Sequence, residues 1–185
     1  MTAPPFGYRP PRFGNWMATY SGTKFWPGDP RSEEIHLGDI AHALSNLCRF
    51  GGHLRHFYSV AEHSVHICRA APESLKRVAL FHDASEAYLV DMPRPIKAML
   101  PEYKNIEAGL EKCIAKRFDL SFPWPRKIKE LDNAILLTEW AMFGGAPEMV
   151  NHLNGNFSEP LKVKLEGWDP QRAELEFLYE ASQWL

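Results

Sequence analysis

The amino-acid sequence predicts an all-α fold that is preceded by a small irregular or β-hairpin segment. From residue 39 onward, apolar residues recur at intervals of three and four, which is the period of an amphipathic helix. The first 30 residues lack that period and are rich in proline, glycine and aromatic residues. We expect a single domain spanning residues 1–185, because a chain of this length can bury a sizeable core.

The N-terminal arm, residues 1–38, contains one candidate hairpin. Two short stretches that contain aromatic residues, within residues 16–26, flank the turn-forming pair Ser21-Gly22. A Pro-Gly-Asp-Pro run follows Trp26 and ends the pattern. We therefore expect a two-stranded hairpin and then a loop.

The catalytic helical core that we predict spans residues 39–142, and a loop and one further helix follow in residues 143–185. In the core we expect helices over residues 39–50, 59–71, 72–88, 103–118 and 126–142. Ser59 and Glu62 form a capping box at the start of the second helix. Asp169 is the expected N-cap of the last helix of the chain.

Composition and charge argue against several classes of partner. The chain is 45% hydrophobic and 24% charged, with a net charge of -2, whereas a groove for a nucleic-acid polymer needs a basic face. No apolar run reaches the length of a membrane span, and the N-terminus lacks a signal-peptide pattern. The three cysteines form no CxxC motif. We expect a protein of the reducing cytoplasm.

The most informative feature is the pair His82-Asp83, which lies in an otherwise apolar stretch. A histidine beside an aspartate is costly to bury unless something satisfies both polar groups. Together with His63 upstream and Asp132 downstream, the pair offers two imidazoles and two carboxylates. That donor set suits a divalent ion of Co, Mn, Zn, Fe or Ni.

Spacing supports convergence of the two histidines. His63 lies nine residues before Pro72, and His82 lies ten residues after it. In an antiparallel helix hairpin that turns at Pro72, both would lie about 14 Å from the turn, at about 1.5 Å per residue. Asp132 must then arrive from a third helix. Without such convergence, each histidine would be an ordinary core residue.

Further polar residues surround these four positions. Glu86 lies one helical turn after His82, and Asp91 follows, so either carboxylate could accept a proton from a bound water. Spacing alone fits a solvated helix end equally well. Arg49, His53 and Lys97 are cationic or imidazole groups that could bind a phosphate.

The pattern of two histidines and two aspartates resembles the metal-binding signature of HD-domain phosphohydrolases. Its similarity extends to the compact branch that includes bacterial 5′-deoxynucleotidases and phage-type deoxynucleoside triphosphate (dATP) triphosphohydrolases. The matching segments are residues 58–64, 82–87 and 91–97, within a region of about 100 residues between Asp39 and Thr138.

The resemblance implies an HD-domain helical bundle in which His63, His82, Asp83 and Asp132 hold one divalent transition metal. It also implies that Glu86 and Asp91 flank the attacking water, and that Arg49 contacts phosphate or sugar. In the deoxynucleotidases a tryptophan follows that arginine and helps to exclude a ribose 2′-hydroxyl. Here the residue is Phe50, which departs from the pattern.

The expected activity is hydrolysis of a (deoxy)nucleotide, most simply of the 5′-deoxynucleotidase type. A triphosphohydrolase is the alternative, because a triphosphate needs more cations. The available groups are Arg49, His53, Arg55, His56 and Lys97. A non-catalytic nucleotide sensor is a further alternative. We expect no organic cofactor and, by resemblance, a homo-oligomer (dimer or hexamer). Trp26 is a candidate wall for stacking a base.

Overall fold

The structure is a computed structural model that describes residues 11–144 and 159–184. Strands β1 (Met17–Ala18) and β2 (Lys24–Phe25) pair antiparallel, which confirms the hairpin. The hairpin is anchored by Phe25, which is fully buried with its ring 4.2 Å from that of Tyr88. Residues 1–10 of the expected arm and residues 145–158 of the expected C-terminal loop lie outside the described residues.

The rest of the described chain is helical, as predicted. The α-helices are α1 (Leu37–Asn46), α2 (Val60–Ala70), α3 (Lys76–Phe81), α4 (Glu86–Leu89), α5 (Arg94–Ala98), α6 (Pro101–Arg117), α7 (Arg126–Phe143) and α9 (Pro170–Ser182). Short 3₁₀ helices are η1 (Ser32–Glu34), η2 (Arg49–Gly52) and η3 (Glu73–Leu75). In the described residues, every helix is too short or too polar to cross a bilayer.

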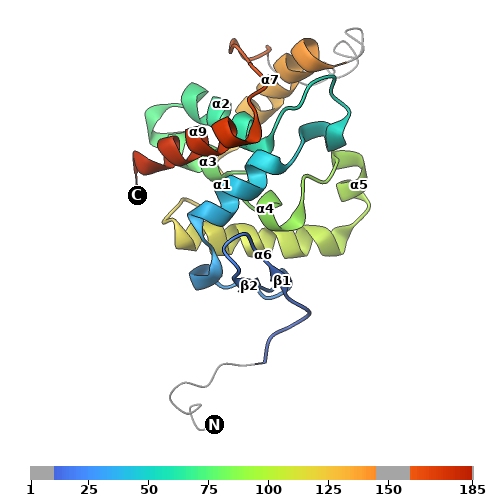
Figure 1. The fold of residues 1–185 in the computed structure, drawn as a ribbon, viewed down its shortest axis with the longest axis vertical. Coiled ribbons are helices and arrows are strands. Elements are labelled where there is room, and N and C mark those ends of the chain that lie inside the picture. Colours follow the sequence, from blue (N-terminus) through green and yellow to red (C-terminus); the bar gives the residue numbers. More distant parts are fainter. Residues whose placement is uncertain (1–10, 145–158, 185) are drawn as a thin grey trace.

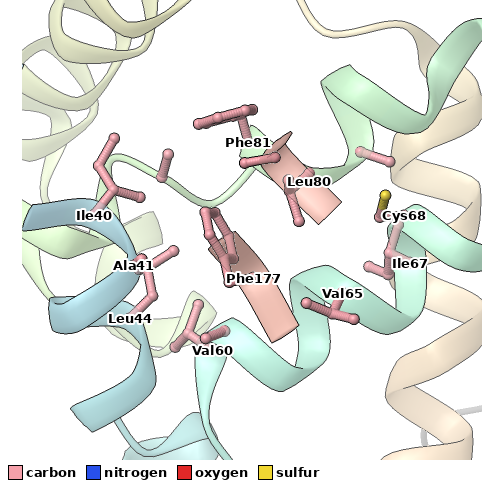
Figure 2. Close-up of a cluster of buried hydrophobic side chains, with 14 of the residues drawn as sticks. Ile40, Ala41, Leu44, Val60, Val65, Ile67, Cys68, Leu80, Phe81 and Phe177 are labelled. Carbon is pink, nitrogen blue, oxygen red and sulfur yellow. The ribbon is translucent and has the colours of Figure 1, made fainter. Parts of the chain in front are cut away.

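Helix α9 closes the bundle by packing on α1, α2 and α3 (Figure 1). Its Phe177 is fully buried, and Figure 2 shows this ring between apolar side chains of α1 and α2, with Phe81 of α3 nearby. The two rings meet edge to face at 5.8 Å. Each large apolar side chain that is buried in this way contributes about 1.5–3 kcal/mol. This core holds α2 against α3.

Helix α1 is shorter than the sequence suggested, because it ends at Asn46 rather than at the double glycine Gly51-Gly52. The chain becomes extended after Asn46, and Cys48 forms an isolated β-bridge with Ser59. The backbone N–H of Arg49 also donates to the carbonyl of Tyr58, at 2.9 Å. These pairings override the helical pattern and fix Arg49 beside the start of α2.

The expected unbroken helix over residues 72–88 is also wrong, because α3 and α4 are separated by a tight turn that carries His82 and Asp83. In this turn the hydrogen bonds run from residue i to i−3, as between Ala84 N–H and Phe81 C=O, and between Glu86 N–H and Asp83 C=O, both at 3.0 Å. Tight stretches of this kind inside a helix often mark functional positions.

The capping box at the start of α2 is confirmed in one half only. The Ser59 hydroxyl accepts from the Glu62 backbone N–H, as predicted. The Glu62 carboxylate does not reach back to Ser59. It is fully buried and accepts from the backbone N–H groups of Glu166, Gly167 and Trp168, at 3.2, 3.0 and 2.6 Å. Glu62 therefore ties the segment before α9 to α2.

Candidate functional site

The two histidines converge as their spacing predicted. The rings of His63 on α2 and His82 after α3 are buried, with centroids 5.4 Å apart. Nδ1 of His82 donates to the carbonyl of Ala79, at 2.8 Å, and Nδ1 of His63 lies 2.5 Å from Oε1 of Glu139. Both Nε2 atoms are buried, and neither has a hydrogen-bond partner among the described residues. Each imidazole is thus oriented with Nε2 available as a ligand atom.

Two carboxylates face these nitrogen atoms. Oδ2 of Asp83 lies 3.3 Å from Nε2 of His63 and 3.2 Å from Nε2 of His82. Oδ1 of Asp132, on α7, lies 3.7 Å from Nε2 of His63. Ligand atoms of His63, His82 and Asp132 all fall within 4.8 Å of one another. Two ligands of one ion at about 2.1 Å lie roughly 3–4 Å apart, so the residues present fit a small divalent metal.

The charges of the site are strongly coupled. Burial and Arg49 lower the pKa of His63, but Glu139 and Asp83 outweigh them and raise it to about 9. Burial raises the pKa of Asp132, yet the pKa falls to about 2 because the two histidines and Arg49 stabilise the carboxylate. A positive charge is therefore held among these carboxylates, as a proton or as a metal ion.

Glu139 is a residue of the candidate site that the sequence pattern did not lead us to predict. It is fully buried on α7, two helical turns after Asp132, and it binds both His63 and Arg49, whose Nη2 lies 3.1 Å from Oε2. A carboxylate on the second nitrogen of a ligand histidine fixes the ring and raises its basicity. The available signal was an acidic residue within the largely apolar stretch around Leu137.

A cavity of about 580 Å³ opens beside the four candidate ligands and is lined by Asp83 and Asp132 among them. Of the predicted substrate residues, Arg49, Phe50, His53 and Lys97 line it. Three further lining residues were not among the predicted substrate residues, namely Arg94, Lys129 and Trp140. The structure places Trp26 elsewhere, with its ring 4.2 Å from the guanidinium of Arg12, so it does not line this cavity.

One wall of this cavity is aromatic. The rings of Phe50 and Trp140 lie 5.6 Å apart and are tilted by 50°. Phe50 has φ of 55° and is followed by Gly51 with φ of 58°. This left-handed backbone is rare for a side chain other than glycine or asparagine. The turn brings Phe50 to the cavity wall, where an aromatic pair can stack on a planar ring.

The two predicted proton acceptors also line the cavity. Glu86 is buried, and its Oε2 has no hydrogen-bond partner among the described residues. Burial raises the pKa of Glu86 well above its usual range, and Asp83 and Asp91 raise it further. Burial also raises the pKa of Asp91. Before Asp91, Val90 has φ of 63°, a strained value for a β-branched residue and of a kind that often occurs at functional sites.

The amino-acid sequence of the chain is similar to those of several known proteins. No family model matches the chain. The uncharacterized protein YfdR of Escherichia coli is 36% identical over 165 aligned residues, which cover 78% of this chain and 93% of that protein. The chain belongs to the YfdR family.

This YfdR-family chain is also similar to two proteins named 5′-deoxynucleotidase. The protein of Vibrio parahaemolyticus is 31% identical over 91 residues, which cover 46% of this chain and 39% of that protein. The protein of Vibrio cholerae is 33% identical over 84 residues, which cover 42% and 35%. The chain thus spans little more than a third of the length of these two nucleotidases, and the similarity supports a nucleotide phosphohydrolase at family level.

Proposed function

We propose that this chain is a divalent-metal-dependent phosphohydrolase of (deoxy)nucleotides, of the HD-domain 5′-deoxynucleotidase type. One observation carries the proposal. The buried Nε2 atoms of His63 and His82 lack hydrogen-bond partners in the described chain, and they face the carboxylates of Asp83 and Asp132. The partial similarity to proteins named 5′-deoxynucleotidase supports the substrate class.

The residues that would hold one divalent ion are His63, His82, Asp83 and Asp132. When bound there, the ion would lower the pKa of a coordinated water and neutralise charge on a phosphoryl oxygen. Glu139 keeps the His63 ring in the orientation that this requires. The carbonyl of Ala79 does the same for His82.

The chain's own side chains supply the remaining chemistry. Glu86 is the candidate general base, because its unpaired carboxylate oxygen is buried at the cavity and burial raises its pKa well above the usual range. Asp91 is the second candidate. Arg49 and Lys97 bring positive charge to the place where a phosphate would lie. Phe50 and Trp140 offer a stacking surface for a base.

A triphosphohydrolase is the second candidate activity. The observation that favours it is the number of basic groups on one cavity. These groups are Arg49, His53, Arg94, Lys97 and Lys129. A triphosphate carries more negative charge than a monophosphate and needs more of such partners.

The proposal is tested by a hydrolysis screen of dNMPs, NMPs, dNDPs and dNTPs with added Mn²⁺ or Co²⁺, with products separated by chromatography. Asp83→Ala removes a candidate metal ligand, and Lys127→Gln is the matched surface control. Phosphate released from dNMPs above the Asp83→Ala background supports a 5′-deoxynucleotidase. Triphosphate released from a dNTP supports the second candidate. No turnover above that background refutes both and leaves a nucleotide sensor.

A further inference from the structure

One carboxylate oxygen of Asp132 forms ion pairs with two basic side chains. Oδ2 accepts from Nη2 of Arg94, at 2.8 Å, and from Nζ of Lys129, at 2.7 Å. Both cations line the 580 Å³ cavity, and their side chains are 48% and 60% exposed. Arg94 reaches Asp132 from α5, across the cavity, whereas Lys129 lies one turn before Asp132 on α7.

The other oxygen of Asp132 faces the metal ligands, because Oδ1 lies 3.7 Å from Nε2 of His63. The carboxylate can therefore bind an ion through Oδ1 while Oδ2 remains with the cations. A divalent ion on Oδ1 would lie within several ångströms of the charges of Arg94 and Lys129. At that separation like charges repel appreciably, even in a partly hydrated site. An ion would weaken the hold of Asp132 on both cations.

In the part of the chain that the structure describes, neither side chain has a second carboxylate partner, and the other hydrogen bond of Arg94 goes from Nη1 to the amide oxygen of Asn133, at 3.1 Å. Among the described residues, Asp132 is the only acidic group that forms an ion pair with either Arg94 or Lys129. The other cations of the cavity differ, since Arg49 is held by Glu139, and Lys97 is held by Glu107 at 2.6 Å. Of the arginine and lysine side chains that line the cavity, Arg94 and Lys129 are thus the two that a ligand can most easily bind.

We propose that Arg94 and Lys129 are a phosphate-binding pair that a metal ion at Asp132 releases from that carboxylate. This inference rests on the metal site of the proposed function. The guanidinium of Arg94 can donate two parallel N–H bonds to phosphate oxygens, and Lys129 adds a mobile charge. Metal and phosphate then bind cooperatively, and by linkage each tightens the other by the same factor.

The test is calorimetric titration of the full chain with Mn²⁺ alone, with inorganic phosphate alone, and with phosphate in the presence of Mn²⁺. The variants are Arg94→Gln and Lys129→Gln. Lys127→Gln is the matched control, because Lys127 lies on the same helix, is exposed, and pairs with Glu130 outside the cavity. Thermal unfolding of each variant shows whether it is folded.

We expect Mn²⁺ to tighten phosphate binding by about tenfold or more in the wild type and in the control. Each variant should lose most of that enhancement. It should also bind Mn²⁺ alone at least as tightly as the wild type, because a competing positive charge has been removed from Asp132. That opposite change in the two affinities is not produced by a general loss of structure.

Two results would overturn the inference. The first is weaker Mn²⁺ binding in the variants with the enhancement intact, which would mean that the pair only orients Asp132. The second is equal phosphate affinity with and without Mn²⁺ in the wild type. The hydrolysis screen is separate, so cooperative binding without turnover would refute the proposed function and leave this inference standing. Turnover without cooperative binding would refute this inference and leave the proposed function standing.

Discussion

Nδ1 of His63 lies 2.5 Å from Oε1 of Glu139, and both side chains are completely buried. The contact joins α2 to α7, which are 76 residues apart in the chain at this point. The second oxygen of Glu139 holds Arg49, at 3.1 Å. One carboxylate therefore orients a candidate metal ligand and also neutralises the buried cation at the cavity wall.

Replacing Glu139 with glutamine should weaken both functions of this carboxylate. We expect Mn²⁺ affinity to fall by about 10- to 100-fold, because the partner that orients the His63 ring is weakened. The free energy of unfolding should fall by about 2 kcal/mol, because the buried charge of Arg49 loses its closer carboxylate partner and keeps only Asp83, at 3.7 Å. Calorimetry and urea unfolding measure the two effects. Glu130→Gln, on the exposed side of α7, should change neither, and unchanged Mn²⁺ affinity in Glu139→Gln would contradict the assignment.

Metal binding should release a proton and strengthen as the pH rises. The pKa of His63 is raised to about 9, so below that pH Nε2 carries a proton that an ion must displace. We therefore expect Mn²⁺ affinity to increase with pH from 6 toward 9 and then to level off. Calorimetry in buffers of different ionisation enthalpy counts the protons released. Zero protons at pH 7.5 would show that His63 is already neutral.

Glu86→Gln should remove catalysis and preserve the metal site. The amide cannot accept a proton, so we expect kcat to fall by about 10²- to 10⁴-fold. Mn²⁺ affinity should stay within a few-fold of that of the wild type, because Glu86 is not among the candidate ligands. Steady-state kinetics on the best substrate of the screen, with Glu102→Gln as an exposed control, makes the comparison. A variant that retains full kcat would exclude Glu86 as the base and direct attention to Asp91.

Glu62→Gln should destabilise the whole fold. The carboxylate accepts hydrogen bonds from three backbone N–H groups, those of residues 166–168, through both of its oxygens. A glutamine amide has only one acceptor oxygen, so at least one of these N–H groups would lose its partner. We expect the free energy of unfolding to fall by about 2 kcal/mol. Urea unfolding measures it, with the exposed Glu73→Gln as the control. A loss below about 0.5 kcal/mol would mean that solvent satisfies those groups equally well.

The features of the fold that depend on local sequence pattern were predictable. Apolar spacing located the long helices, and Ser59 and Asp169 cap helices as expected. The spacing of His63 and His82 about Pro72 predicted that they meet, and their rings lie 5.4 Å apart although His82 follows the end of α3. The bundle and the meeting of the two histidines were therefore predictable.

Contacts between distant segments were not predictable. The partners of Glu62 lie more than 100 residues further along the chain, so local spacing suggested a capping box instead. Glu139 and Trp140 reach the site because α7 packs on α2, and no spacing rule specifies that packing. Helical periodicity also continues through the break between α3 and α4, so it did not indicate the turn at His82 and Asp83. Trp26 was assigned to the site by its residue type, and the fold places it elsewhere.

The backbone clamp on Glu62 also sets an order of events during synthesis. The ribosome adds residues 166–168 only after the segments that form α1 to α7 have been translated, and domains generally fold as their chains emerge. Until then Glu62, beside His63, lacks its backbone donors, and the surface later covered by Phe177 is exposed. A chain that stalled before residue 166 would expose this apolar surface and would therefore be prone to aggregation.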